Sequence, residues 1–174
     1  STSTHDNSAE ALQKAYSFSH NMSFPDFLPS NQIISLMSDS LNDNRWAHNF
    51  EVFNKSGNND SMYYIRKFAY PFMSIPVITY SEMIFIKAES AIMMNKTGVI
   101  QEELDDFSRI MERAYKNYIL QTGNEHLSRL IRQEKRKEFA FQGLRLHEMK
   151  RHKTKIGPYS WNDSHLILNI PDNE

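Results

Sequence analysis

The fold of this chain is decided by one stretch of sequence, residues 134–151, which reads EKRKEFAFQGLRLHEMKR. Two acidic residues at its start, Glu134 and Glu138, stand four positions apart and share one face of a helix at 100° per residue. Gly143 follows five residues later, and glycine is favoured just past the end of a helix. The stretch therefore predicts the last turns of one helix, a break at Gly143 and a second, shorter helix.

The helical face that carries the two acids is otherwise apolar. Its apolar members are Leu127, Leu130, Ile131 and Phe141. Because an unpaired buried charge is costly, the two carboxylates need compensation. A catalytic acid–base pair is one interpretation and requires a cleft that solvent can reach. Pairing with arginine is commoner, since guanidinium groups bind carboxylates through two hydrogen bonds. We therefore predict no catalytic residue and a structural ion-pair network of Glu134, Glu138, Arg113 and Arg145.

Glycine and proline mark the other helix boundaries. Residues 77–157 contain no proline, and their glycines are Gly98, Gly123, Gly143 and Gly157. Proline breaks helices, whereas glycine is typical of their ends. We expect four helices, the first two antiparallel, near residues 79–96, 100–121, 124–142 and 144–154. The tail, residues 157–174, reads as loop with a short extended piece at 166–170.

Local patterns support the first two of these helices. Thr79 followed three residues later by Glu82 is a capping-box pattern. In the second helix, apolar and aromatic residues recur at alternating spacings of three and four, which defines one buried seam. This seam consists of Leu104, Phe107, Met111, Ala114 and Tyr118. A single helical hairpin cannot bury its own faces, so we expect further helices to pack against it.

The first 78 residues differ from the rest of the chain. They are rich in Ser, Asn and Asp, and we expect short helices at residues 9–18 and 30–40. Residues 46–72 hold eight of the 21 aromatic residues, on both sides of a turn-forming segment at residues 54–60. This arrangement favours a β-hairpin.

The aromatic cluster of residues 46–72 has two interpretations. Aromatic rings beside Asn and Asp side chains can stack on sugars and bind their hydroxyl groups, as in concave ligand sites. Alternatively, the rings form the core where this segment packs on the helices, which is the interpretation that we favour.

Composition excludes several classes of function. The chain of 174 residues has a formal net charge of −1 and no cysteine, which excludes disulfides, cysteine-bound metals and cysteine nucleophiles. No apolar run approaches the roughly 18 residues of a membrane helix. His147 begins a sequence that resembles the zinc-protease motif HExxH, but Arg151 stands where the second histidine is needed. We expect no metal and no cofactor.

A basic tract runs from Arg129 to Lys155, with ten Lys or Arg residues against three Glu. Such an excess invites a nucleic-acid interpretation or a protein-interaction domain. The cations, however, spread over a broad arc of the predicted helices, which favours a solvated helix surface and no nucleic-acid partner.

Four segments of the chain together resemble the SusD/RagB family, the nutrient-binding outer-membrane lipoproteins of Bacteroidetes. The most specific of them is the stretch quoted above, which is similar to the family pattern Err.ELafEG.R..DL.R. The order and spacing of all four segments also fit the family. The other three are Pro29-Ser30 followed by a helix and Asp43-Asn44-Arg45, the helix YSEMIFIKAESA at residues 80–91, and the terminal IPDNE at residues 170–174.

The resemblance implies a mainly α-helical fold of antiparallel hairpins, a tetratricopeptide-like superhelix, with a loop-rich N-terminal segment and a short β-hairpin. It implies that residues 1–174 are the C-terminal lobe of a longer protein, with a loop-rich segment at 1–78, a helical core at 79–156 and a tail at 157–174. Such proteins bind glycans or oligosaccharides without catalysis. They are lipid-anchored at the cell surface and partner a SusC-like TonB-dependent transporter. No ligand-binding residue is transferred by the resemblance.

Overall fold

The computed structural model describes residues 27–38, 42–54, 61–68, 78–94, 100–116, 118 and 124–167. Within these residues the chain is mainly helical, with one two-stranded antiparallel sheet, which confirms the expected fold class. The chain divides into two compact units, residues 1–138 and 139–174. The helix expected at residues 9–18 lies outside the described residues. None of the described helices combines the length and the apolar character that a membrane span requires.

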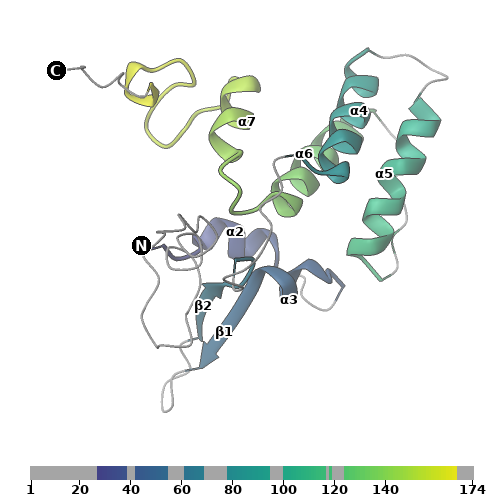
Figure 1. The fold of residues 1–174 in the computed structure, drawn as a ribbon. Helices are drawn as coiled ribbons and strands as arrows, with labels where there is room; N and C mark the ends of the chain where they lie inside the picture. The colour runs from purple at the N-terminus through teal and green to yellow at the C-terminus, as the bar shows by residue number, and fades with distance from the viewer. Residues whose placement is uncertain are drawn as a thin grey trace, which may run out of the picture. The chain divides into compact units, whose positions relative to one another are not determined.

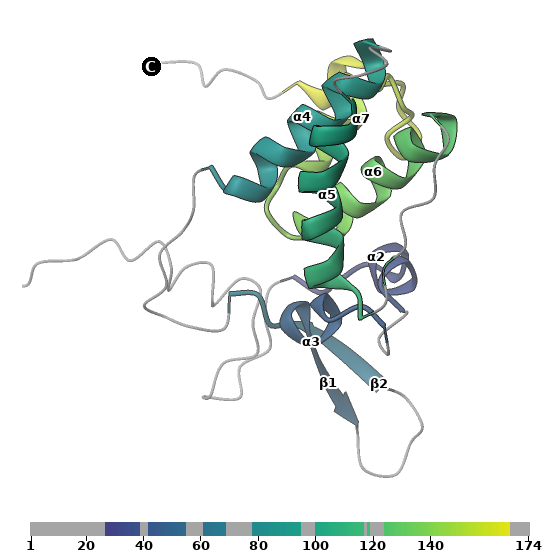
Figure 2. The same cartoon turned by 90° about the vertical axis from the view of Figure 1, so that its right-hand side faces the viewer.

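Three helices of 15 residues each form the helical part of the first unit: α4 (Tyr80–Met94), α5 (Ile100–Ala114) and α6 (Asn124–Glu138). Helices α4 and α5 lie side by side and run in opposite directions, as predicted, and α6 packs against α4 (Figures 1 and 2). The rings of Phe85 and Phe107 are fully buried and meet edge to face at 5.6 Å. This geometry suits aromatic pairs and joins α4 to α5.

The start of the helical hairpin and its buried seam follow from local sequence. At the start of α4, the Oγ1 of Thr79 accepts a hydrogen bond of 3.2 Å from the backbone N–H of Glu82, as the capping-box pattern predicts. On α5, the predicted seam is buried from Leu104 to Ala114. The glycines expected to end α4 and α5, Gly98 and Gly123, lie outside the described residues.

Helix α5 ends at Ala114, seven residues before the predicted end at residue 121. The reason is a backbone pairing with the segment that precedes α3 (Arg45–Asn49). Asn44 N donates to Ala114 O at 2.7 Å, and Asp43 forms a β-bridge with Tyr115. The carbonyl of Ala114 thus finds its partner in another segment instead of in the next turn of its own helix.

Helix α6 ends at Glu138, four residues before the predicted end at residue 142. Phe141 has a φ of 68° and Gly143 a φ of 77°, both in the left-handed region that a right-handed helix cannot use. Phe141 therefore lies beyond the helix, and the prediction from periodicity that it continues the apolar face is wrong.

The N-terminal part of the first unit carries two short helices and the hairpin. They are α2 (Asn31–Leu36), α3 (Arg45–Asn49), β1 (Phe50–Asn54) and β2 (Ser61–Ile65). The strands pair in register from Phe50 opposite Ile65 to Asn54 opposite Ser61, which confirms the predicted β-hairpin. Helix α2 is shorter than the predicted span of residues 30–40.

The second unit contains α7 (Arg145–Arg151) and a short 3₁₀ helix, η1 (Ser164–Leu166). Lys150 Nζ donates to the carbonyl of Leu166 at 2.6 Å, which joins the two helices. The predicted helix at residues 144–154 is shorter than expected because Lys153 adopts a φ of 53°. Leu166 lies in the 3₁₀ helix and not in an extended piece, and residues 168–170 lie outside the described residues.

Candidate functional site

Arg45, the first residue of α3, lies at the centre of a buried ionic cluster. Its Nε and Nη2 donate to the two carboxylate oxygens of Asp43 at 2.9 and 2.8 Å, and its backbone N–H donates to the same carboxylate at 3.0 Å. Both side chains are almost fully buried. This bidentate contact is the strongest kind of pair that arginine forms with a carboxylate, and it fixes the start of α3.

Glu134 of α6 completes this cluster from another element. Its carboxylate accepts hydrogen bonds from Arg45 Nη2 at 2.5 Å and from the Tyr115 hydroxyl at 2.7 Å. Only 3% of the residue is exposed. Lys137 Nζ lies 3.3 Å from the same carboxylate and donates to the Tyr115 hydroxyl at 2.6 Å. We call these five residues the Arg45 network: Asp43, Arg45, Tyr115, Glu134 and Lys137.

Glu138 lies at the edge of the Arg45 network. Its carboxylate forms an ion pair with Arg113 Nη2 at the end of α5, and Arg45 Nη1 is 3.7 Å away. The side chain of Arg113 is 60% exposed, in contrast to that of Arg45. Glu138 is therefore shared between an exposed cation and a buried one.

The structure places the four predicted network residues differently. Arg113 contacts Glu138, whereas the arginine that binds Glu134 is Arg45. Arg145 begins α7 in the second unit, and its pairing with the two acids stays a prediction. Arg45 and Asp43 were visible in the sequence as part of a family motif, Asp-x-Arg. Nothing in the local pattern, however, connected that motif with Glu134, which lies 89 residues further on.

The electrostatics of the Arg45 network favour its ionised form. Burial alone would raise the pKa of the Asp43 carboxyl, but the hydrogen bonds and charge of Arg45 outweigh burial and hold it below its usual range. Burial opposes the charge on Arg45, yet Asp43 and Glu134 together raise its pKa. The pKa of the Tyr115 hydroxyl is raised by burial and by the charge of Glu134. Asp43 and Arg45 thus keep their charges, and Tyr115 keeps the proton that it donates to Glu134.

This burial bears on the catalytic interpretation of the acid pair. That interpretation required Glu134 and Glu138 to line a cleft open to solvent, and Glu134 instead lies buried against Arg45. Its two oxygens already accept hydrogen bonds from Arg45 and Tyr115. The arrangement favours a structural role for Glu134.

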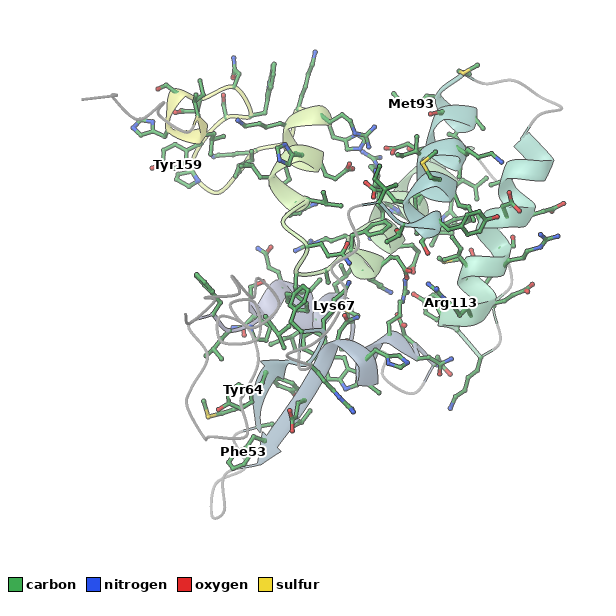
Figure 3. The ribbon with its side chains drawn as sticks, in the orientation of Figure 1. Phe53, Tyr64, Lys67, Met93, Arg113 and Tyr159 are labelled. Carbon is green, nitrogen blue, oxygen red and sulfur yellow. The ribbon has the colours of Figure 1, made fainter. Side chains whose placement is uncertain are left out.

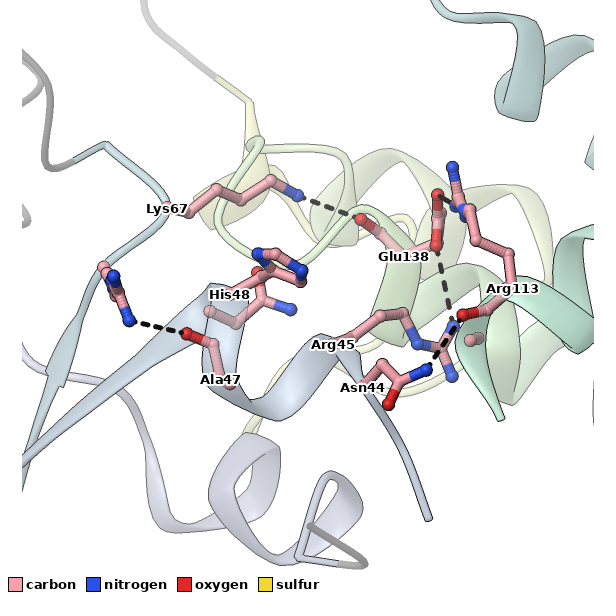
Figure 4. Close-up of a pocket in the computed structure, with 10 residues that line it drawn as sticks. Asn44, Arg45, Ala47, His48, Lys67, Arg113 and Glu138 are labelled. Carbon is pink, nitrogen blue, oxygen red and sulfur yellow. Dashed lines mark hydrogen bonds and ion pairs between the residues drawn. The ribbon is translucent and has the colours of Figure 1, made fainter. Parts of the chain in front are cut away.

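A pocket of about 530 Å³ opens beside the network. Its walls come from α3, the residues after β2, the end of α5 and the end of α6 (Figure 4). Four of its lining residues are basic, and one, Glu138, is acidic. We call this cavity the basic pocket; its charged lining residues are Arg45, Arg66, Lys67, Arg113 and Glu138.

Hydrogen bonds to backbone carbonyls hold the wall of the basic pocket in place. Lys67 Nζ donates to the carbonyl of Glu138 at 2.9 Å, and Arg66 Nη1 donates to that of Ala47 at 3.3 Å. Burial lowers the pKa of Lys67 to about 8; the charge of Glu138 raises it and that of Arg45 lowers it. Burial is thus the dominant influence on the pKa of Lys67, ahead of the two nearby charges. Sequence reasoning did not identify this lysine, because nothing local marks it as buried.

The basic tract of residues 129–155 serves partly as internal structure. Lys135 is buried and lies 3.4 Å from Glu89 of α4, while Lys137 belongs to the Arg45 network. Arg136 donates to the Gln32 side chain at 3.3 Å. The cations of α6 therefore join it to other elements of the first unit and do not present one continuous basic surface.

The aromatic cluster is divided between core and surface. Phe50, Tyr64 and Phe68 are buried, and the ring of Trp46 packs on that of Phe50 at 4.7 Å. Phe53, on the hairpin away from α3, is 51% exposed, whereas Tyr64 on the paired strand is buried (Figure 3). These buried rings support the core interpretation for the part of the cluster that the structure describes.

Fold and site together define a class of protein: a mainly helical domain in which a buried ionic network joins an N-terminal hairpin segment to antiparallel helices, with a basic pocket beside the network. A family model described as the SusD family matches residues 31–166. The chain belongs to the SusD family. Proteins of this family bind nutrients at the outer membrane and work with TonB-dependent transporters. No curated protein and no solved structure matches the chain.

Proposed function

We propose that this chain is part of a non-catalytic protein that binds glycans or oligosaccharides at the bacterial cell surface. The observation that carries this proposal is the family match, which spans 136 of the 174 residues. The motif residues behind it, Asp43, Arg45 and Glu134, meet in one buried network. They therefore support the family fold, and of the three Arg45 also lines the basic pocket.

The proposed partner is a SusC-like TonB-dependent transporter, to which the binding protein delivers its ligand. The whole protein would be held at the outer-membrane surface by an N-terminal lipid anchor. The family to which the chain belongs supports both statements. On this proposal residues 1–174 form the C-terminal lobe, and the internal use of Lys135 and Lys137 speaks against a nucleic-acid surface on α6.

Ligand binding is tested by titrating the purified protein with neutral and acidic oligosaccharides and following the heat released. We expect saturable binding of at least one oligosaccharide. Binding to RNA or DNA that weakens steeply with salt, in the absence of any glycan binding, would overturn the proposal, because that dependence is typical of phosphate contacts.

The transporter partnership is tested by affinity purification of the tagged full-length protein from solubilised outer membranes of its own host. We expect a TonB-dependent transporter to co-purify in stoichiometric amount. A tagged outer-membrane lipoprotein of another family from the same cells serves as the control. Recovery of the transporter with both proteins, or with neither, would contradict the partnership.

A further inference from the structure

The basic pocket carries an excess of positive charge that the Arg45 network does not consume. Apart from Arg45, which pairs with Asp43 and Glu134, the described lining includes three basic residues and one acidic residue, a balance of 3 − 1 = +2. Lys137, Asp43 and Glu134 belong to the network behind it. A concave site with charge of one sign and protein walls concentrates the electric field and attracts the opposite charge. The pocket is therefore suited to an anion.

Two arginines of the pocket, Arg66 and Arg113, retain donors beyond their contacts in the structure. Arg66 uses Nη1 on the Ala47 carbonyl, and Arg113 uses Nη2 on Glu138. A guanidinium group has five N–H donors, so one contact leaves several for a ligand. Arg113 is also largely exposed, which allows it to reorient toward a bound group.

One buried donor at the pocket also indicates an anionic ligand. Among the described residues, Arg45 Nη1 has no hydrogen-bond partner, although the side chain is only 9% exposed. Its nearest charged neighbour, Glu138 Oε2, is 3.7 Å away, beyond hydrogen-bond distance. Because buried polar groups normally have partners, this donor calls for an acceptor that the described residues do not supply.

The size of the pocket and the other polar residues of its wall indicate which class of anion it suits. About 530 Å³ is far more than an inorganic ion needs and falls within the range of roughly 300–1,000 Å³ typical of small-molecule sites. Asn44, His48 and Asn49 add amide and imidazole groups to the wall, and such groups suit the hydroxyls of a sugar. Arginine forks match the planar carboxylate geometry.

We propose that the basic pocket binds the carboxylate of a sugar acid, with Arg66, Lys67 and Arg113 as the groups that contact it and Arg45 as a fixed positive charge behind them. The inference rests on the proposed function, because it names the class of glycan: a uronic acid, either free or within an acidic oligosaccharide. The Asn and His side chains around the cations contact the sugar hydroxyls.

The test is calorimetric titration of the protein at low salt with four probes: glucuronate, glucose, N-acetylglutamate and sulfate. We expect glucuronate to bind, glucose to bind at least about tenfold more weakly, and sulfate not to compete at equal concentration. Binding of N-acetylglutamate as tight as that of glucuronate would show that the carboxylate alone is recognised and would overturn the sugar-acid assignment. Equal binding of sulfate would overturn it in favour of a general anion site.

Matched variants locate the binding in the pocket. Arg66→Gln removes an exposed pocket charge that donates to the backbone carbonyl of Ala47. Arg132→Gln removes a comparable exposed arginine on α6, which donates to the Ser128 carbonyl at 3.2 Å. We expect Arg66→Gln to weaken glucuronate binding by about tenfold and Arg132→Gln to leave it unchanged, with melting temperatures equal to that of the parent. Equal effects of the two variants, or no effect of either, would overturn the site.

The same experiments separate this inference from the proposed function. If a neutral oligosaccharide binds and Arg66→Gln does not alter that binding, the nutrient-binding proposal stands and the acidic pocket ligand is excluded. If only N-acetylglutamate binds, and Arg66→Gln abolishes it, the pocket is an anion site and the glycan assignment fails. Lys67→Met gives a second pocket variant should Arg66→Gln fold poorly.

Discussion

At the scale of single residues, Glu134 determines how the ionic network can be tested. Its carboxylate accepts hydrogen bonds from Arg45 and Tyr115 and lies beside Lys137, and only 3% of Glu134 is exposed. Removing one partner of a buried ion pair leaves the other charge without compensation, which typically costs about 3–5 kcal/mol. We expect Glu134→Ala to lower the free energy of unfolding by that amount in urea titrations.

Glu112→Ala provides the control for this substitution. Glu112 lies on the exposed side of α5, where a surface substitution usually changes stability by less than about 0.5 kcal/mol. Glu134→Ala should also leave ligand affinity nearly unchanged when folded proteins are compared. If the variant kept its melting temperature but lost ligand binding, Glu134 would be a functional residue and the structural interpretation would be wrong.

Lys67 makes stability depend on pH. Its pKa falls from an ordinary value of 10.5 to about 8 in the folded protein, chiefly because of burial. Between these values the unfolded chain binds more protons than the folded one, so stability rises with pH from about 8 to about 10.5 and the cost of the buried charge is fully present below 8. We expect Lys67→Met to remove this slope from unfolding free energies measured across the range.

Tyr118 has the opposite effect on folding stability at high pH. Burial and the charge of Glu134 raise the pKa of its hydroxyl from 10.0 to about 12. Because the folded state then holds the proton more tightly than the unfolded state, stability is lost as pH rises above about 10.

A Lys67→Met protein whose stability rose between pH 8 and 10 as much as that of the parent would contradict the role given to Lys67.

At the scale of elements, the helical hairpin depends on the contact between α4 and α5. The ring of Phe107 is fully buried against Phe85, and truncating a buried phenylalanine costs about 3–5 kcal/mol. We expect Phe107→Ala to destabilise the protein by that amount in chemical denaturation. Met93→Ala is the control, because Met93 is 72% exposed near the end of α4 (Figure 3).

The break before α7 depends on the backbone of Gly143. Its φ of 77° lies in the left-handed region, and a Cβ added there would meet nothing within 4 Å. Strain, and not a clash, is therefore the expected effect of a side chain. We expect Gly143→Ala to cost about 1–2 kcal/mol and Gly143→Asn less, since asparagine tolerates this conformation. Equal unfolding midpoints for the two variants would contradict this explanation.

At the scale of the whole molecule, Arg45 connects distant parts of the first unit. It lies at the start of α3 and contacts Asp43 beside it, Tyr115 after α5 and Glu134 on α6. Residues in one ion-pair network are energetically coupled by about 0.5–3 kcal/mol. A double-mutant cycle of Arg45→Met and Glu134→Gln should therefore show a coupling energy in this range.

Pairing Arg45→Met with Glu112→Gln gives the reference cycle, because Glu112 is exposed on α5. Its coupling should fall within the error of the measurement. If both cycles were additive, Arg45 and Glu134 would not stabilise each other, and the N-terminal segment would be held to the helices by apolar packing alone.

The sequence by itself determined the features that depend on near neighbours. Helical spacing and glycine positions identified α4, α5 and α6, and the turn residues among the aromatics identified the β-hairpin. The apolar surroundings of Glu134 showed that it must be buried and paired. The sequence motifs also identified the family. All of these follow from contacts within a few residues, which a sequence pattern records directly.

Only the tertiary structure decided which groups meet across long separations. It placed Arg45 on Glu134 across 89 residues, ended α5 at Ala114 by pairing it with Asn44, and brought Arg66 and Lys67 to the same pocket as Arg113. Periodicity constrains a residue relative to those three or four positions away, so it cannot select among several arginines as the partner of one glutamate. That selection is made when the elements pack, because only the packed arrangement leaves the fewest buried charges without a partner.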